Sequence, residues 1–170
     1  MAADLILVVG CTGAGKTTYA RALADEIGGV RFSIDEWMVT LFGPDRPEPI
    51  EFAWMIERID RCEAQIFAMV RQLAARGVPA VLDLGFIQKA HRDRFRALAH
   101  EAGLTAAVHF VDVPADERWC RVNRRNKEQG ETYAMHVDRG MFDFMEGRWE
   151  RPAEAEWSAG GGTRIDGWTR

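Results

Sequence analysis

The stretch Gly10-Cys11-Thr12-Gly13-Ala14-Gly15-Lys16-Thr17 decides the fold, because it matches the phosphate-loop pattern G-x-x-x-x-G-K-[ST] at every required position. A continuous apolar run, residues 5–9, precedes this loop, and good helix formers follow from Lys16 to Ile27. A buried strand before the loop and a helix after it are the context that the pattern requires. The glycines let successive backbone N–H groups point at an anion, and the helix N-terminus adds partial positive charge.

The loop predicts how a nucleoside triphosphate and its metal ion would be held. We expect the Lys16 ammonium group to bind the β- and γ-phosphates and the Thr17 hydroxyl to bind Mg²⁺. The other residues expected to cradle the phosphates are Gly10, Thr12, Gly13, Ala14, Gly15 and Thr18.

Apolar runs alternate with helical patterns along the rest of the chain. Further strands are expected at residues 30–34, 79–84, 106–113 and 163–165. One helix is expected to begin at Glu36, and a separate long helix is expected to end near Gly77. Further helices are expected over residues 91–102, 115–125 and 141–149. Strands that alternate with helices predict an α/β protein with a parallel sheet and right-handed crossovers.

Composition narrows the possible classes of protein. The 170 residues, 47% hydrophobic and 28% charged, fit one domain over residues 1–170 and exclude a disordered chain. A net charge of −4 disfavours a dedicated nucleic-acid or membrane binder, and three scattered cysteines disfavour zinc and disulfides. Without a signal peptide or an apolar run long enough to span a bilayer, we expect a cytoplasmic protein, monomeric or dimeric.

Two acidic residues follow predicted strands and are candidates for chemistry. Asp35 closes the second strand, where ligands of open α/β sheets bind, and its carboxylate could accept the proton of an attacking hydroxyl. Asp35 could instead be the N-cap of the helix that begins at Glu36. Asp83 ends an apolar strand, as does a Walker B acid that binds Mg²⁺ directly or through water. It could equally pair with an arginine in the substrate pocket or be a turn residue. Trp37, next to Asp35, is a candidate for stacking on a substrate ring.

The helix after the fourth strand carries a basic face. Arg118, Arg121 and Arg125 recur at spacings of three and four and share one side, and residues 116–128 have a net charge of +2. A solvated helix is the usual explanation of such a run. After the fourth strand of a phosphate-loop protein, however, a mobile lid can bring arginines onto the phosphoryl group. We therefore expect Arg118 to contact the nucleotide and Arg121 and Arg125 to be catalytic.

Four segments together resemble a known group of proteins: Gly10–Thr18, Ser33–Glu36, Val81–Asp83 and Asp112–Asn126. They resemble the small P-loop kinases of the AAA-family ATPase type. That group is similar to zeta toxins, chloramphenicol phosphotransferase and the kinase domain of polynucleotide kinases. The resemblance extends over nearly the whole chain, including Met141–Pro152.

The resemblance implies a P-loop NTPase three-layer sandwich, with a sheet ordered 2-3-1-4-5 and an Arg-rich lid over roughly residues 114–136. It also implies transfer of the ATP γ-phosphate to a hydroxyl, with Asp35 as the general base, Arg121 and Arg125 in the lid, and Asp83 near the acceptor. One position departs from polynucleotide kinases, because Gln129 stands where they have a catalytic arginine.

Three functions remain open at this stage. The leading one is an ATP- and Mg²⁺-dependent kinase of a small-molecule hydroxyl. The alternatives are a nucleotide-dependent switch that acts through a partner and a polynucleotide 5′-hydroxyl kinase. Residues 35–63 carry eight acidic and three basic side chains, a net charge of −5. If they wall the acceptor pocket, a polar, neutral or amine-bearing alcohol, such as a sugar or an antibiotic-like compound, is favoured over nucleic acid.

Overall fold

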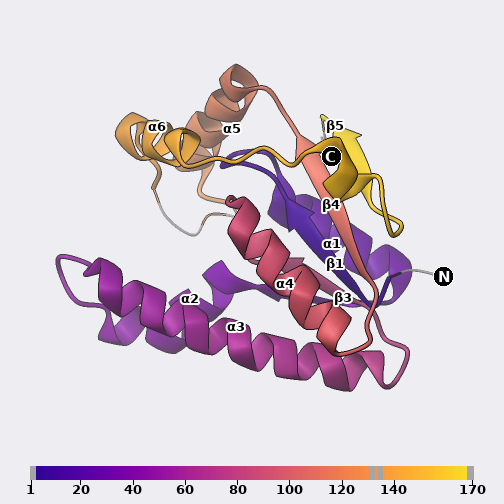
Figure 1. Cartoon of the computed structure of the whole chain (residues 1–170). Helices are drawn as coiled ribbons and strands as arrows, with labels where there is room; N and C mark the ends of the chain where they lie inside the picture. Colours follow the sequence, from indigo (N-terminus) through magenta and orange to yellow (C-terminus); the bar gives the residue numbers. More distant parts are fainter. Residues whose placement is uncertain (1–2, 131–132, 134–135, 168–170) are drawn as a thin grey trace.

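A five-stranded, all-parallel sheet forms the centre of the computed structural model, which describes residues 3–130, 133 and 136–167. Its strands are β1 (Leu5–Val9), β2 (Val30–Ser33), β3 (Ala80–Asp83), β4 (Ala106–Asp112) and β5 (Thr163–Asp166). They lie in the order β2-β3-β1-β4-β5 (Figure 1), which confirms the order expected for a P-loop NTPase. Four residues of the expected lid, 131–132 and 134–135, lie outside the described residues.

Helices cover both faces of this sheet. They are α1 (Lys16–Ile27), α2 (Ile34–Phe42), α3 (Phe52–Ala74), α4 (Lys89–Glu101), α5 (Ala115–Glu128), α6 (Arg139–Gly147) and α7 (Glu154–Trp157), with a 3-10 helix at Gly43–Asp45. Successive side chains of a strand point to opposite faces, so β1 serves two cores. Leu5 and Leu7 pack in the core that contains residues of α3 and α4, whereas Ile6 and Val8 pack with residues of α1.

The junction of β2 and α2 differs from the sequence prediction. The strand ends at Ser33, and α2 begins at Ile34, two residues earlier than expected. Ser33 is the N-cap, and its hydroxyl accepts a hydrogen bond from the Glu36 amide at 3.4 Å. The prediction that Asp35 could cap this helix is therefore wrong, because a serine two residues earlier does so and leaves the Asp35 carboxyl for other contacts.

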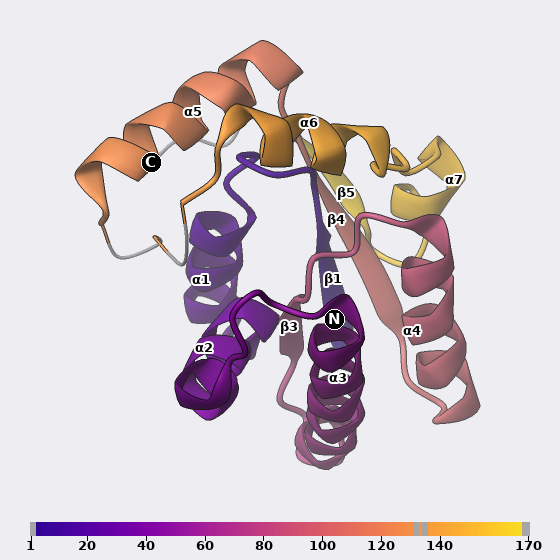
Figure 2. The ribbon, with the colours of Figure 1, turned by 90° about the vertical axis from the view of Figure 1, so that its left-hand side faces the viewer.

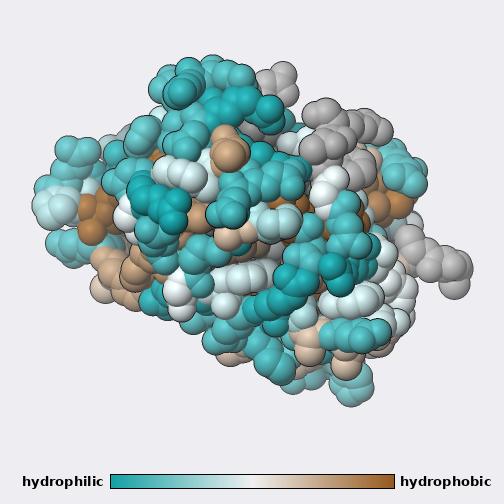
Figure 3. Space-filling view, turned by 90° about the horizontal axis from the view of Figure 1, so that it is seen from above, coloured by the Kyte–Doolittle hydropathy of each residue, from teal (hydrophilic) through white to brown (hydrophobic). Residues whose placement is uncertain are grey.

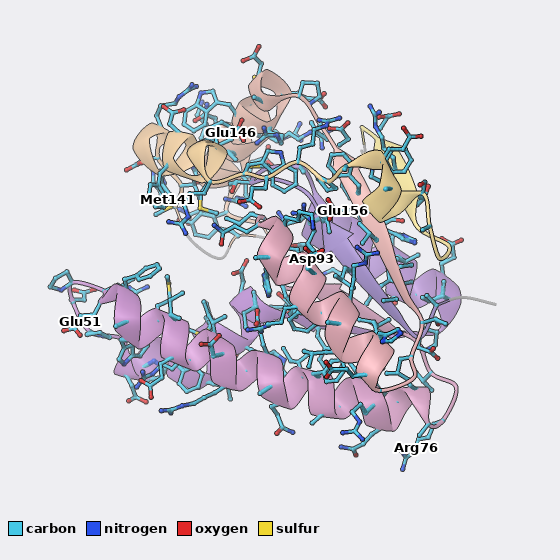
Figure 4. All side chains as sticks on the ribbon, viewed as in Figure 1. Glu51, Arg76, Asp93, Met141, Glu146 and Glu156 are labelled. Atoms are coloured by element: carbon cyan, nitrogen blue, oxygen red, sulfur yellow. The ribbon has the colours of Figure 1, made fainter. Side chains whose placement is uncertain are left out.

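A buried ion pair joins the C-terminal part of the chain to the central fold. The Arg92 side chain on α4 is fully buried and donates to both oxygens of Glu156 on α7, at 2.8 and 3.2 Å (Figure 4 labels Glu156). It also donates to the Phe86 carbonyl at 3.2 Å. Burial opposes the ionisation of Glu156, but the hydrogen bonds from Arg92 outweigh it and lower the pKa of Glu156.

Among the described residues, no helix has the length and apolar character needed to cross a bilayer.

Candidate active site

A cavity of about 780 Å³ opens at the carboxyl edge of the sheet. Residues of α2 and the start of α3 line it on one side, residues of α5 and α6 line it on the other, and the phosphate loop lies against α5 (Figure 2). The loop follows β1, Asp35 follows β2 and Asp83 ends β3, so three neighbouring strands deliver these groups to one place. Ligands of open α/β sheets bind at this edge.

The phosphate loop lies at the base of the cavity. Thr12, Gly13, Gly15, Lys16, Thr17 and Thr18 line the cavity, as expected for residues that cradle phosphates, and we call this region the phosphate end. Gly10 and Ala14 instead lie below the lining, where Ala14 is buried in the core shared by β1 and α1. The Lys16 ammonium group donates to the Cys11 carbonyl at 3.3 Å and so stays folded over its own loop.

Packing, as well as phosphate binding, requires glycine in this loop. Gly13 has a φ of +81°, and a Cβ placed there would lie 2.6 Å from the Arg118 carbonyl oxygen of α5. A Cβ at Gly10 would lie 2.8 Å from the Val111 carbonyl oxygen of β4. The loop therefore lies directly against β4 and α5, which the sequence motif does not reveal.

Asp35 and Asp83 lie in the same cavity. Asp35 is exposed to the cavity, yet the protein atoms around the recess partly desolvate its carboxyl, and this raises its pKa. The charge of Asp83 raises the pKa of Asp35 further, whereas Lys16 and Arg125 oppose the rise. Asp83 is buried, and Arg31 of β2 donates to its Oδ2 at 3.3 Å. The sequence left open a pairing with an arginine in the substrate pocket, but Arg31 is not one of the residues that line the cavity. Arg31 also binds Glu36.

Two of the three expected arginines line the cavity. Arg121 donates to the Ala14 carbonyl at 3.2 Å and to Glu117 at 2.5 Å. The Nε atom of Arg125 is buried and has no hydrogen-bond partner among the described residues. Burial lowers the pKa of Arg125, and the charge of Asp35 opposes this. An arginine held near a carboxylate with an unsatisfied donor is suited to bind an added anion.

Arg118 lies beneath the loop rather than in this cavity. Its guanidinium donates to the carbonyls of Val113 (2.9 Å) and Thr12 (3.1 Å) and pairs with Glu146 of α6 at 2.8 Å. Glu146, labelled in Figure 4, also accepts from the Cys11 thiol at 2.8 Å, and burial raises the pKa of that thiol to about 11. These contacts hold the phosphate loop, α5 and α6 together. The sequence did not point to Glu146.

The residues at the phosphate end fit a magnesium ion. The Thr17 hydroxyl and the carboxylates of Asp35 and Asp83 all line the cavity. Mg²⁺ in phosphate-transfer sites takes one or two carboxylates, with phosphate oxygens and water as its other ligands. Across residues 3–130, 133 and 136–167, no three His, Cys, Asp or Glu side chains gather as a metal cage.

The far part of the cavity is apolar, which the sequence analysis missed. Side chains of α2, α3, α6 and the loop before α3 line it, and we call this region the apolar end; it includes Phe42, Ile50, Trp54, Met55, Ile59 and Met141. The tryptophan suggested from the sequence was the wrong one, because Trp37 packs edge-on against Phe32 instead. The spacing of Met55 and Ile59, one helical turn apart, was the available signal.

The acidic segment does not wall this cavity. Of the eight acids in residues 35–63, all of which the structure describes, Asp35 alone lines it. Several of the others pair with side chains outside the lining: Glu57 pairs with Arg61, Asp60 with Arg94, and Glu63 with Arg94 and His91. The premise that a net charge of −5 faces the acceptor is therefore wrong.

Solved structures with the same fold include several kinases. The chain aligns with a gluconokinase from Sinorhizobium meliloti 1021 at a TM-score of 0.62 and 18% identity, covering 97% of this chain and 83% of that one. It aligns with the APS kinase CysC of Mycobacterium tuberculosis, in complex with AMPPNP and APS, at a TM-score of 0.64 and 16% identity. This alignment covers 95% of this chain and 87% of that one. It also aligns with Kti12 of Chaetomium thermophilum, in complex with ADP-AlF3, at a TM-score of 0.68 and 19% identity, covering 95% of this chain and 88% of that one.

Sequence comparison identifies the family. No curated protein matches the chain. A family model described as an AAA domain matches residues 5–152, from β1 to just beyond α6, and therefore includes the phosphate loop, Asp35, Asp83 and the basic helix. With the P-loop kinases among the structural neighbours, this confirms the resemblance drawn from the sequence, and the chain belongs to the AAA domain family.

Proposed function

We propose that this protein is an ATP- and Mg²⁺-dependent kinase that transfers the γ-phosphate to a hydroxyl group of a small molecule. The observation that carries the proposal is the meeting of Lys16, Asp35 and Arg125 in one cavity. A carboxylate with a raised pKa, between two cations that would bind phosphate, is typical of a phosphoryl-transfer site. The names of the neighbouring gluconokinase and APS kinase support a small-molecule acceptor.

The residues divide the work of the reaction. Lys16 and the loop amides hold the triphosphate. Asp35 accepts the proton of the acceptor hydroxyl while the oxygen of that hydroxyl attacks the γ-phosphorus. The new P–O bond forms as the bond to the β–γ bridging oxygen breaks, which leaves ADP and a phosphate ester. Arg125 and Arg121 stabilise the charge of the phosphoryl group in transit. Thr17 with Asp83 would hold Mg²⁺, which neutralises the developing charge.

The contacts of Arg118 and Asp83 bear on the roles proposed for them. Arg118 serves as a positioning residue for the loop, because its donors are engaged by Val113, Thr12 and Glu146. Asp83 keeps a candidate metal role, but its partner Arg31 also fixes its orientation. The cytoplasmic location, the single domain and a monomer or dimer stay predictions.

The direct test is the transfer of ³²P from [γ-³²P]ATP to a library of hydroxyl compounds. Asp35→Asn should retain ATP affinity and lower turnover by about 10²–10⁴-fold, the usual contribution of general base catalysis. Asp45→Asn is the matched control, because Asp45 lies on the neighbouring 3-10 helix outside the cavity lining. ATP hydrolysis that no hydroxyl compound changes, and that a protein partner alone accelerates, would favour the switch over the kinase.

A further inference from the structure

The apolar end of the cavity points to the chemical class of the acceptor. Hydrophobic side chains from α2, α3 and α6 converge there, on both sides of the opening. Figure 4 shows Met141 on α6, across from the end of α3 near which Glu51 is labelled. Hydrophobic residues also gather at the left-hand edge of Figure 3, the side on which Figure 1 places α6 and the start of α3.

Hydrogen-bonding side chains are scarce at this end. Apart from the groups already discussed, the charged side chains among the described residues that line the cavity are Arg46, Arg124 and Glu128, and Arg46 pairs with Glu48 at 3.6 Å. A polyhydroxylated acceptor would bury hydroxyl groups there without partners, and such groups lose their hydrogen bonds to water. An apolar body would instead release water from both surfaces.

The aromatic part of this wall is held in place before any ligand binds. The rings of Phe42 and Trp54 meet edge-on, with centroids 6.5 Å apart. The guanidinium of Arg58 lies over the Trp54 ring at 4.0 Å and donates to the Trp54 carbonyl at 3.0 Å. A fixed indole can pack against a ligand at a small cost in side-chain entropy. The wall is therefore built as a binding surface and is not a collapsed core.

We propose that the acceptor is an uncharged alcohol with an apolar body, aliphatic or aromatic, whose hydroxyl reaches Asp35 while its body lies against Trp54, Met55 and Met141. This inference rests on the proposed kinase function and replaces the sugar-like acceptor favoured by the sequence. The distribution of groups in the cavity supports it, with Asp35 and Asp83 at one end and hydrophobic side chains at the other.

A matched series of six-carbon alcohols tests the proposal. Phosphorylation should be fastest with hexan-1-ol, slower with hexane-1,6-diol and slowest with the hexitol sorbitol. Along the 1-alkanols from ethanol to hexanol, kcat/KM should rise about fourfold for each methylene that becomes buried. Equal or faster phosphorylation of sorbitol would overturn the apolar acceptor and leave the kinase function standing.

A binding measurement separates the two proposals when no transfer is seen. The uncharged dye prodan should gain fluorescence on binding the nucleotide-free protein, and hexan-1-ol should displace it. Met55→Gln and Met141→Gln keep the side-chain length but add polar groups, and each should weaken prodan binding about tenfold or more. Leu41→Gln, on the exposed side of α2 and outside the lining, is the control and should bind prodan as the unaltered protein does.

The outcomes are distinct. Displacement by hexan-1-ol that depends on Met55 and Met141 supports the apolar acceptor site, whatever the transfer assay shows. If no alcohol is phosphorylated, that result contradicts the proposed kinase function instead. Prodan binding that is absent, or that both glutamine variants leave unchanged, overturns the apolar site whatever the transfer assay shows.

Discussion

The two ends of the cavity are built on different principles. At the phosphate end, backbone geometry and fixed charges decide the structure: Gly13 has a positive φ, and the Thr12 carbonyl is held by Arg118. At the apolar end, side chains of α2, α3 and α6 supply a hydrophobic wall with few polar partners. Under the proposed function, the first end would bind one invariant group, a triphosphate, whereas the second would be free to vary with the acceptor.

That difference explains why sequence reasoning succeeded at one end and failed at the other. A phosphate loop requires particular residues at fixed spacing, so eight consecutive letters predicted it. The apolar wall has no such pattern, because its residues come from separate segments and any hydrophobic side chain of suitable size would serve. The charge count over residues 35–63 gave a wrong expectation, since seven of the eight acids lie outside the cavity lining, where Glu57, Asp60 and Glu63 pair with arginines.

Lys16→Ala should break the phosphate end most severely. The loss of the ammonium group that neutralises the β- and γ-phosphates should lower phosphoryl transfer by at least about 10²–10³-fold, the cost of one lost charge-stabilising contact. The rate of ³²P transfer measures the loss, and circular dichroism checks the fold. Lys127→Ala, on the same basic helix but outside the lining, should keep its activity. A folded Lys16→Ala protein with full turnover would contradict the assignment.

Gly13→Ala tests whether the loop owes its shape to packing against α5. The new Cβ would lie 2.6 Å from the Arg118 carbonyl oxygen at a φ of +81°, so we expect a loss of about 1–3 kcal/mol in the free energy of unfolding. Denaturant unfolding without nucleotide measures it. Gly43→Ala is the control, because a Cβ there meets nothing within 4 Å. Equal stability of the two variants would mean that α5 does not constrain the loop.

Asp83→Asn should shift the pH dependence of the reaction. Activity that needs the Asp35 carboxylate falls as the pH drops through its pKa, which lies above the ordinary value of 3.8. Removing the charge of Asp83 lowers the pKa of Asp35, so the acid limb of kcat/KM should move to lower pH, although the rate at the plateau also falls if Asp83 helps to bind Mg²⁺. The full pH–rate profile separates these effects. An acid limb that stays in place would mean that Asp83 does not act on Asp35.

The resemblance to P-loop kinases predicted the order of the strands, but the sequence did not predict every boundary or contact. Alternating apolar runs and helical patterns were sufficient for the parallel sheet, since the strands β1 and β3 are buried along their whole length. The start of α2 was misplaced, because the decisive hydrogen bond joins the Ser33 side chain to the Glu36 amide. The roles of Arg118 and Glu146 depend on contacts between segments far apart in the chain, which local patterns do not encode.

The central claim is that the phosphate end and the apolar end are separate binding regions of one cavity, and paired affinity measurements on two variants test it most directly. ATP affinity is measured by titration calorimetry and prodan affinity by fluorescence, for Lys16→Ala and Met55→Gln. We predict that Lys16→Ala weakens ATP binding at least about tenfold, the weight of a charge-assisted hydrogen bond, and leaves prodan binding unchanged. Met55→Gln should weaken prodan binding and leave ATP binding unchanged. If either variant weakens both ligands equally, the cavity has no separate ends and the account is contradicted.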